Sequence, residues 1–400
     1  MADLGGHKEI SFDKMFKMMV FSMWLNKSHP KVPRNLKWIC QFALMHGIFF
    51  FTYCLLIYST IFHDLKNKDI SQACANGILS VIFNVVSLQY AVMVWHQSKF
   101  HDMIEKMKLD YKQAENLPKE EYDIVLRYAK KGRTIVYLWL KIVICVASLF
   151  PIKSFTLMLY YHVIGEFRYV PLYDITYPEP VELNKNNLAV FLALYVLFLF
   201  YDFYALFMYL AFSPLGPILI LHVCGQLELV ENRIMKTFSK SKNTAESIKN
   251  LKRVAIHFVE IYGFAARINS SLRVFHELLF KAGAIILPIT FYQIIETAKR
   301  GQVSVEFISI IFGAVAICSV PCYYSDVLME KSEDVRRALY SCGWESNWDP
   351  VTRSLLFLLL TRASRPVAMR TLYRNICLNV LTDIYHQAYA IFNLLNAVWH

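Results

Sequence analysis

The stretch Trp38–Phe62, WICQFALMHGIFFFTYCLLIYSTIF, runs for 25 residues without a formally charged side chain. A helix needs about 20 mostly apolar residues to cross the hydrocarbon core of a bilayer. The next stretch, 70–95, is also uncharged. Because lipid offers no partner to backbone polar groups, long apolar runs of this kind predict membrane-spanning helices.

Five further stretches bring the prediction to seven spans. Pro151 is expected to kink the third, and the sequence 213–217, SPLGP, to break or kink the chain after the fourth. The run Leu355–Leu360 is too short to span, so 350–365 is interpreted as a helix packed outside the membrane. The additional predicted spans are 134–160, 188–212, 274–297, 307–325 and 375–398.

The composition supports a membrane protein and excludes other classes. Hydrophobic residues make up 56% of the 400 residues and charged residues 18%, which excludes a disordered chain. The net charge of +11 comes from cations placed between apolar blocks, so no nucleic-acid partner is predicted. The nine cysteines include no CxxC pair, so neither a disulfide framework nor a metal site is expected. Motifs of nucleotide-binding, zinc-protease and serine-hydrolase sites are absent, so we predict neither an enzyme nor a cofactor.

The placement of Lys and Arg predicts the topology. Most cations lie in 1–37, 97–133, 225–273 and 331–374, and an excess of cations marks cytosolic segments. The sequence therefore predicts an all-α polytopic membrane protein with seven transmembrane helices, a cytosolic N-terminus and an extracellular C-terminus. Its predicted parts are a cytosolic N-terminal segment (1–37), helices one to six with their loops (38–330), a cytosolic helical anchor and subunit-contact segment (331–374), and a seventh helix (375–400).

Several C-terminal motifs, in this order and spacing, resemble the insect odorant receptor family. The segment Tyr340–Trp344 (YSCGW) precedes a short apolar helix and Arg365–Val367 (RPV), and the last span contains Ala388–Leu395 (AYAIFNLL). Two helix exits are also similar to those of the family. They are Cys322–Ser325 (CYYS) followed by Glu330–Ser332 (EKS), and His222–Leu227 (HVCGQL). The resemblance is specific over about 320–396, and the length and topology agree elsewhere.

The resemblance implies an odorant-tuning subunit of a ligand-gated, non-selective cation channel. Such subunits bind a small volatile odorant and form heterotetramers with the shared odorant co-receptor in the plasma membrane of sensory neurons. The gustatory receptors have the same architecture and are the main alternative. A G-protein-coupled receptor is a weaker alternative, because the predicted topology is the inverse of that class.

The resemblance also implies an odorant pocket in the outer half of the membrane, among the second, third, fourth and sixth helices. A site for small apolar molecules needs aromatic and aliphatic walls. For any one of these side chains, ordinary helix packing or lipid contact is the more common explanation. The predicted ligand-binding residues are Ile78, Ile82, Phe83, Phe150, Phe155, Met158, Tyr161, Phe191, Tyr195, Phe198, Ile308, Ile311 and Phe312.

Polar residues form a stripe along the last predicted span. At 100° per residue, its members fall within about 40° of one direction. Such a stripe faces protein or water, so helix–helix hydrogen bonding and pore lining both explain it. The resemblance favours the pore and places the gate at Leu394 and Val398, beside Ala397. Leu394 and Val398 lie about 100–140° from the centre of the stripe. The stripe contains Asn375, Asn379, Thr382, His386 and Asn393, and the predicted pore residues are Asn379, His386, Asn393, Leu394, Ala397 and Val398.

Two carboxylates lie within predicted spans, where an acid is costly unless it is paired or functional. For Asp202 we favour pairing with Lys141 or another buried donor, with an amine ligand as the alternative. For Asp383 we favour pairing with a neighbour such as Arg374, with attraction of cations as the alternative. The aromatic loop Tyr169–Pro178 is interpreted either as a lid over the pocket or as an interfacial anchor.

Overall fold

The computed structural model describes residues 8–240, 244–346 and 349–399. Within these residues the secondary structure is helical, apart from an isolated bridge between Arg370 and Asn375. The helices are α1 (Phe12–Met15), α2 (Lys17–Leu25), α3 (Leu36–Tyr58), the π-helix η1 (Ser59–Asp64), α4 (Ile70–Trp95), α5 (Gln97–Ala114), α6 (Lys119–Ile164), α7 (Glu179–Glu182), α8 (Leu188–Phe212), α9 (Leu215–Lys240), α10 (Thr244–Lys299), α11 (Val305–Ser341), the short 3-10 helix η2 (Trp344–Ser346), α12 (Pro350–Ala363) and α13 (Leu378–Trp399).

Local sequence signals begin several of these helices. The side chains of Asn35, Asp69, Asn187 and Asp349 each accept a hydrogen bond from a backbone N–H in the first turn of α3, α4, α8 and α12, respectively. This satisfies one of the N–H groups that a helix start leaves unpaired.

Six helical segments in the described part of the chain are long and apolar enough to cross a membrane, and they contain the first six predicted spans. The segment that contains the fourth runs through α8 and α9. The seventh predicted span, 375–398, overlaps the helix α13, whose polar stripe lowers its hydropathy. The helix begins three residues later than predicted, so Asn375 of the predicted stripe lies before it, in the bridge with Arg370. The six segments are Leu36–Asp64, Ile70–Trp95, Lys119–Ile164, Leu188–Phe238, Thr244–Lys299 and Val305–Ser341.

The main departure from the sequence prediction is that the spans do not end where charge begins. Residues 119–133 belong to the same 46-residue helix as the third span, and α10 is a single helix of 56 residues. At 1.5 Å per residue α10 extends about 84 Å, far beyond a hydrocarbon core of about 30 Å. Charged side chains end an apolar run, but Lys, Glu and Arg are good helix formers, so the helix continues.

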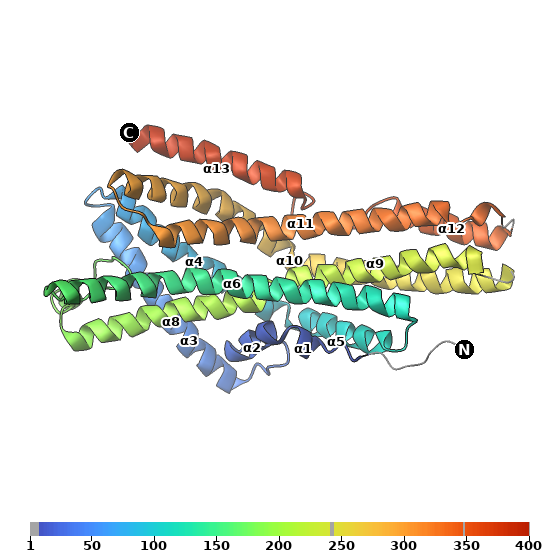
Figure 1. Cartoon of the computed structure of the whole chain (residues 1–400), viewed down its shortest axis with the longest axis horizontal. Helices are drawn as coiled ribbons and strands as arrows, with labels where there is room; N and C mark the ends of the chain where they lie inside the picture. The colour runs from blue at the N-terminus through green and yellow to red at the C-terminus, as the bar shows by residue number, and fades with distance from the viewer. Residues whose placement is uncertain (1–7, 241–243, 347–348, 400) are drawn as a thin grey trace.

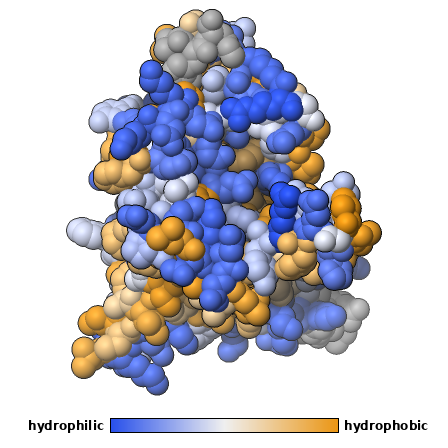
Figure 2. All heavy atoms as spheres, turned by 90° about the vertical axis from the view of Figure 1, so that its left-hand side faces the viewer, coloured by the Kyte–Doolittle hydropathy of each residue, from blue (hydrophilic) through white to orange (hydrophobic). Residues whose placement is uncertain are grey.

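The long helices run side by side along the molecule (Figure 1). Their charged extensions gather with α5 and α12 at the right of the view, which we name the charged end, and α9 packs there against α6, α10 and α11. The opposite end, which we name the loop end, carries the connections 165–187 and 300–304. Figure 2 shows the loop end with hydrophilic side chains over its centre and hydrophobic ones toward its margins.

The helix α13 lies along one side of the bundle and packs against α10 and α11 (Figure 1). Its base is fixed by Ser325, a fully buried residue of α11. The Ser325 hydroxyl donates to the carbonyl of Ile376 at 2.7 Å and accepts from the N–H of Met369 at 3.1 Å. One hydroxyl thus joins the segment before α13 to the bundle at two points.

Replacing Ser325 with alanine is expected to lower the thermal stability of the purified receptor. The change leaves a buried N–H and a buried carbonyl with one partner fewer, at a cost of about 1–3 kcal/mol. The measurement is the Tm in detergent, with Ser341→Ala as the control because the exposed Ser341 bonds only within its own helix. Equal Tm values for the two variants would contradict this role of Ser325.

Candidate functional site

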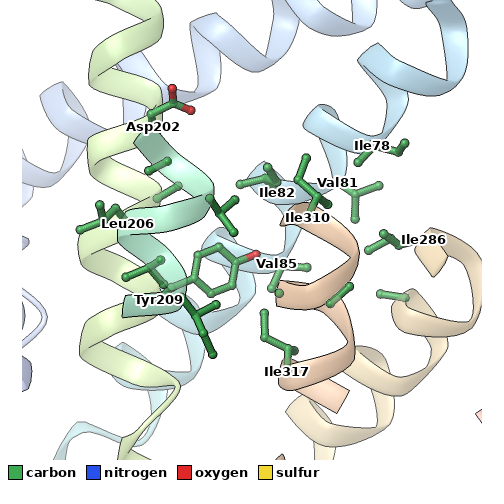
Figure 3. Close-up of a pocket in the computed structure, with 18 of the residues that line it drawn as sticks. Ile78, Val81, Ile82, Val85, Asp202, Leu206, Tyr209, Ile286, Ile310 and Ile317 are labelled. Atoms are coloured by element: carbon green, nitrogen blue, oxygen red, sulfur yellow. The ribbon is translucent and has the colours of Figure 1, made fainter. Parts of the chain in front are cut away.

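A cavity of about 130 Å³ lies where α4, α6, α8, α10 and α11 meet (Figure 3), and we name it the bundle cavity. Nearly all of its wall is aliphatic or aromatic. The helices present residues at i, i+3, i+4 and i+7 spacing, as one helical face requires. On α11 these residues are Ile310, Gly313, Ala314 and Ile317.

The size of the bundle cavity suits a small organic molecule. A dry cavity of about 150 Å³ lined by aliphatic and aromatic groups binds benzene in another protein. A cavity of similar size and lining therefore accommodates a single ring or a short chain. Close approach of α10 and α11 helps to form it, because a Cβ at Gly283 would lie 2.5 Å from the Sγ of Cys318.

A second cavity of about 380 Å³, which we name the loop cavity, lies at the loop end. Its wall includes residues from η1, α4, the loop 169–177 and α8. The loop folds inward, so that Leu172, Tyr173, Ile175 and Tyr177 are all at least nine-tenths buried. Burial and the nearby Glu182 carboxylate raise the pKa of Tyr177, so its hydroxyl keeps its proton.

Polar contacts hold this loop against the first two long helices. The N–H of Thr176 donates to the hydroxyl of Ser59 at 3.0 Å. The buried Asp64 carboxylate accepts from the Asn76 amide at 2.8 Å, and the same amide lies 3.3 Å from the carbonyl of Asp174. These contacts give the loop a defined path.

Tyr173 separates the two cavities. Its side chain lines the bundle cavity, whereas Leu172 and Asp174 line the loop cavity. The ring of Tyr173 meets Phe150 and Phe198 edge to face, with centroids 5.0 and 5.2 Å apart. Its hydroxyl donates to Oδ1 of Asp202. The predicted pairing of Asp202 is thus confirmed, but the donor is Tyr173 and not Lys141.

The structure divides the predicted ligand-binding residues into three groups. Ile78, Ile82 and Phe150 line the bundle cavity, and Phe191, Tyr195 and Phe198 line the loop cavity. The others line neither cavity. Phe83 is buried against Tyr53 and Phe49, whereas Phe155 and Phe312 are 63% and 70% exposed on the outer surface. The remaining predicted residues, which are partly buried, are Met158, Tyr161, Ile308 and Ile311.

Sequence reasoning did not find several residues of the bundle cavity. Trp139, Tyr209 and Ile286 line it at positions deeper in the bundle than the outer halves from which the predicted residues were taken. The signal available for them is the helical spacing of large apolar residues. That spacing does not say which of two apolar faces turns toward the other helices.

The predicted pore residues lie on the exposed face of α13. Asn379, His386, Asn393, Leu394 and Ala397 are all exposed, while the side chain of Val398 lies outside the described part. The helix buries the opposite face through Val380, Ile384 and Ala388. Asp383 forms an ion pair with Arg374 at 2.6 Å, which confirms the predicted pairing.

The family profile described as "7tm Odorant receptor" matches residues 69–389, which is most of the chain. The chain belongs to the insect odorant receptor family. Members resemble it over very different lengths. Odorant receptor Or2 of Anopheles gambiae is 22% identical over 344 residues, which are 83% of this chain and 86% of that protein. Odorant receptor 56a of Drosophila melanogaster is 32% identical over 75 residues, only 19% of this chain and 18% of that protein.

Solved structures share the fold of this odorant receptor. The insect olfactory receptor OR5 from Machilis hrabei, in complex with eugenol, superposes with a TM-score of 0.76 over 96% of this chain and 98% of that one, at 13% identity. A second structure of OR5 from Machilis hrabei gives a TM-score of 0.68 over 96% of each chain, at 16% identity. The receptor is thus a multi-pass membrane protein with the helical fold of an insect olfactory receptor.

The pair formed by Tyr173 and Asp202 is expected to show strong coupling in a double-mutant cycle. Tyr173→Phe alone leaves the carboxylate without its donor and should lower the free energy of unfolding by about 1–3 kcal/mol. Asp202→Leu alone leaves the Tyr173 hydroxyl without its acceptor. The double variant should be closer to wild type than the sum of the single variants, because it removes both polar partners. The measurement is the Tm of each purified receptor. Additive Tm changes would contradict the coupling.

Proposed function

We propose that this odorant receptor is the ligand-binding subunit of a ligand-gated, non-selective cation channel, and that the bundle cavity is its odorant site. The observation that carries the proposal is the nearly all-apolar cavity at the meeting point of five helices. Small volatile molecules are mostly apolar, and their burial in such a cavity is favourable. The cavity lies nearer the middle of the bundle than the outer-half pocket predicted from the sequence.

The helix α11 connects the proposed site with the proposed pore. It lines the bundle cavity through Ile310 and Ile317, and it contacts α13 through Ser319, whose hydroxyl lies 3.0 Å from that of Tyr385. A ligand opens the channel only to the extent that it binds the open arrangement more tightly than the closed one. A change in the position of α11 around the ligand is the simplest means of moving α13.

The exposed polar face of α13 supports a pore shared between subunits. Within the described residues Asn379, His386 and Asn393 have no side-chain hydrogen-bond partner. Lipid cannot satisfy them, whereas water in a central pore can. We propose that the α13 helices of this receptor and of odorant co-receptor subunits surround the pore in a heterotetramer. Leu394 and Val398 would form the gate, next to Ala397.

The charged end is proposed to be cytosolic and to hold the subunits together. It contains the cation-rich segments, in agreement with the positive-inside tendency. The helix α12 exposes Phe357 and Leu358 by 70% and 64%, and such large apolar side chains favour contact with another subunit. In this orientation the C-terminus lies outside the cell. The membrane is proposed to be the plasma membrane of a sensory neuron.

The direct test is whole-cell current in cells that express the receptor with and without the insect odorant co-receptor, against a panel of volatiles. A cation current evoked only in the presence of both proteins is the expected result. Absence of current to every volatile, with the receptor confirmed at the cell surface, would contradict the proposal and direct attention to tastants.

Replacing Gly313 with alanine should shift the preferred odorant size downward. The added methyl group would lie 3.6 Å from Cγ2 of Val146, an ordinary contact, so the fold should tolerate it while the cavity shrinks. In a homologous series of odorants, the most potent member is expected to shorten by about one carbon, because a methyl and a methylene occupy similar space. The control is Gly263→Ala, where nothing lies within 4 Å of the added group. The same optimum in both variants would argue against odorant binding in this cavity.

Opposite charges at Asn393 should change permeation in opposite directions. Asn393→Asp is expected to raise the permeability to Ca²⁺ relative to Na⁺, and Asn393→Lys to lower cation current, because a charge in a pore attracts or repels passing ions. The odorant concentration for half-maximal current should change little, since Asn393 lies on the exposed face of α13 and does not line the bundle cavity. The measurement is the reversal potential under bi-ionic conditions. Unchanged reversal potentials in both variants would show that Asn393 of α13 does not line the pore.

A further inference from the structure

Tyr209 places a hydroxyl group in the largely apolar bundle cavity. It lies on α8, one turn before the helix ends at Phe212. Figure 3 shows its ring projecting from the helix into the cavity, with its oxygen directed toward Val85. The structure gives this hydroxyl no hydrogen-bond partner within the described residues, although the residue is partly buried in the bundle.

The other polar groups of the cavity wall are less available to a ligand. The Tyr173 hydroxyl already donates a hydrogen bond to Oδ1 of Asp202. Oδ2 of Asp202 and Nε1 of Trp139 also lack partners, but both atoms are buried beneath the surface of the wall. In Figure 3 the carboxylate of Asp202 lies at one edge of the group of lining side chains, whereas the Tyr209 hydroxyl lies among them. Among the described residues, the Tyr209 hydroxyl is therefore the polar group that faces the interior.

We propose that the Tyr209 hydroxyl is a specificity-determining group that hydrogen-bonds a single oxygen or nitrogen atom of the odorant. The preferred ligands would be small molecules with an apolar body and one uncharged polar group, such as alcohols, ketones and aldehydes. This inference rests on the proposed role of the bundle cavity as the odorant site, and it names the ligand class of that site.

The energetics of an apolar cavity favour ligands with one uncharged polar group over hydrocarbons and over charged or more polar molecules. A hydrocarbon fills the cavity but leaves the hydroxyl without a partner. A molecule with one polar group loses its own water contacts on entry, and Tyr209 replaces one of them. A charged molecule, or one with several polar groups, loses more contacts with water than one hydroxyl can replace. Discrimination should therefore be greatest between molecules of equal shape that differ by one oxygen.

The test compares, on purified receptors, ligands of similar shape in which an oxygen atom takes the place of a carbon atom. The ligand pairs are benzyl alcohol with ethylbenzene and acetophenone with cumene. Binding is measured from the rise in Tm with ligand concentration, which follows from ligand binding to the folded state and needs no channel opening. The variant is Tyr209→Phe, which keeps the ring. The control is Tyr137→Phe, because Tyr137 is a half-exposed residue of α6 outside the cavity wall.

Wild type and the Tyr137→Phe control are expected to bind the oxygen-containing member of each pair about tenfold more tightly than its hydrocarbon partner, which corresponds to about 1.4 kcal/mol. In Tyr209→Phe this preference should largely disappear through weaker binding of the oxygen-containing ligands, with hydrocarbon affinity unchanged. Retention of the preference in Tyr209→Phe, or an equal loss of affinity for both members, would overturn the inference while leaving odorant binding in place. If no ligand stabilises the wild type, both the inference and the proposed odorant site are wrong.

Discussion

Hydrocarbon offers no partner to a peptide N–H or carbonyl, so every segment that crosses it must satisfy these groups internally, and helices do so. In this chain the consequence extends beyond the apolar runs. The helices α6, α10 and α11 continue without a break into the charged end, because their charged residues are also good helix formers. Three of the five helices that line the bundle cavity therefore extend beyond it into the charged end, and among the described lining residues only Tyr173 comes from a loop.

The order and position of the long helices could be predicted from the sequence, because hydropathy and charge are local properties. Stretches such as Trp38–Phe62 identify a span without reference to any other part of the chain. The walls of the cavities could not be predicted in this way. On α11, Ile310 faces the bundle cavity and Phe312 faces outward, although both are large and apolar, and only the neighbouring helices decide between them. The donor to Asp202 lies 29 residues earlier in the chain, in a loop whose inward path no local pattern specifies.

The helix α11 contributes both to the wall of the bundle cavity and to the attachment of α13. Ile317 and Cys318 line the bundle cavity, and Ser325 holds the segment that leads into α13. Pro321 lies between them, inside the helix. Proline removes one backbone hydrogen bond and favours a bend at that point of a helix. A ligand in the proposed site would therefore contact α11 on one side of this proline, and the segment that leads into α13 is joined to α11 on the other side.

The polar face of α13 also bears on how the receptor is made in the cell. If the proposed heterotetramer forms, a newly synthesised subunit without a partner would present Asn379, His386 and Asn393 to acyl chains, at an energetic cost that assembly would remove. The partner subunit would then stabilise the folded, inserted state by mass action. The amount of receptor that survives cellular quality control would follow the supply of its partner, and a neuron could set the number of its receptors by setting the expression of one shared subunit.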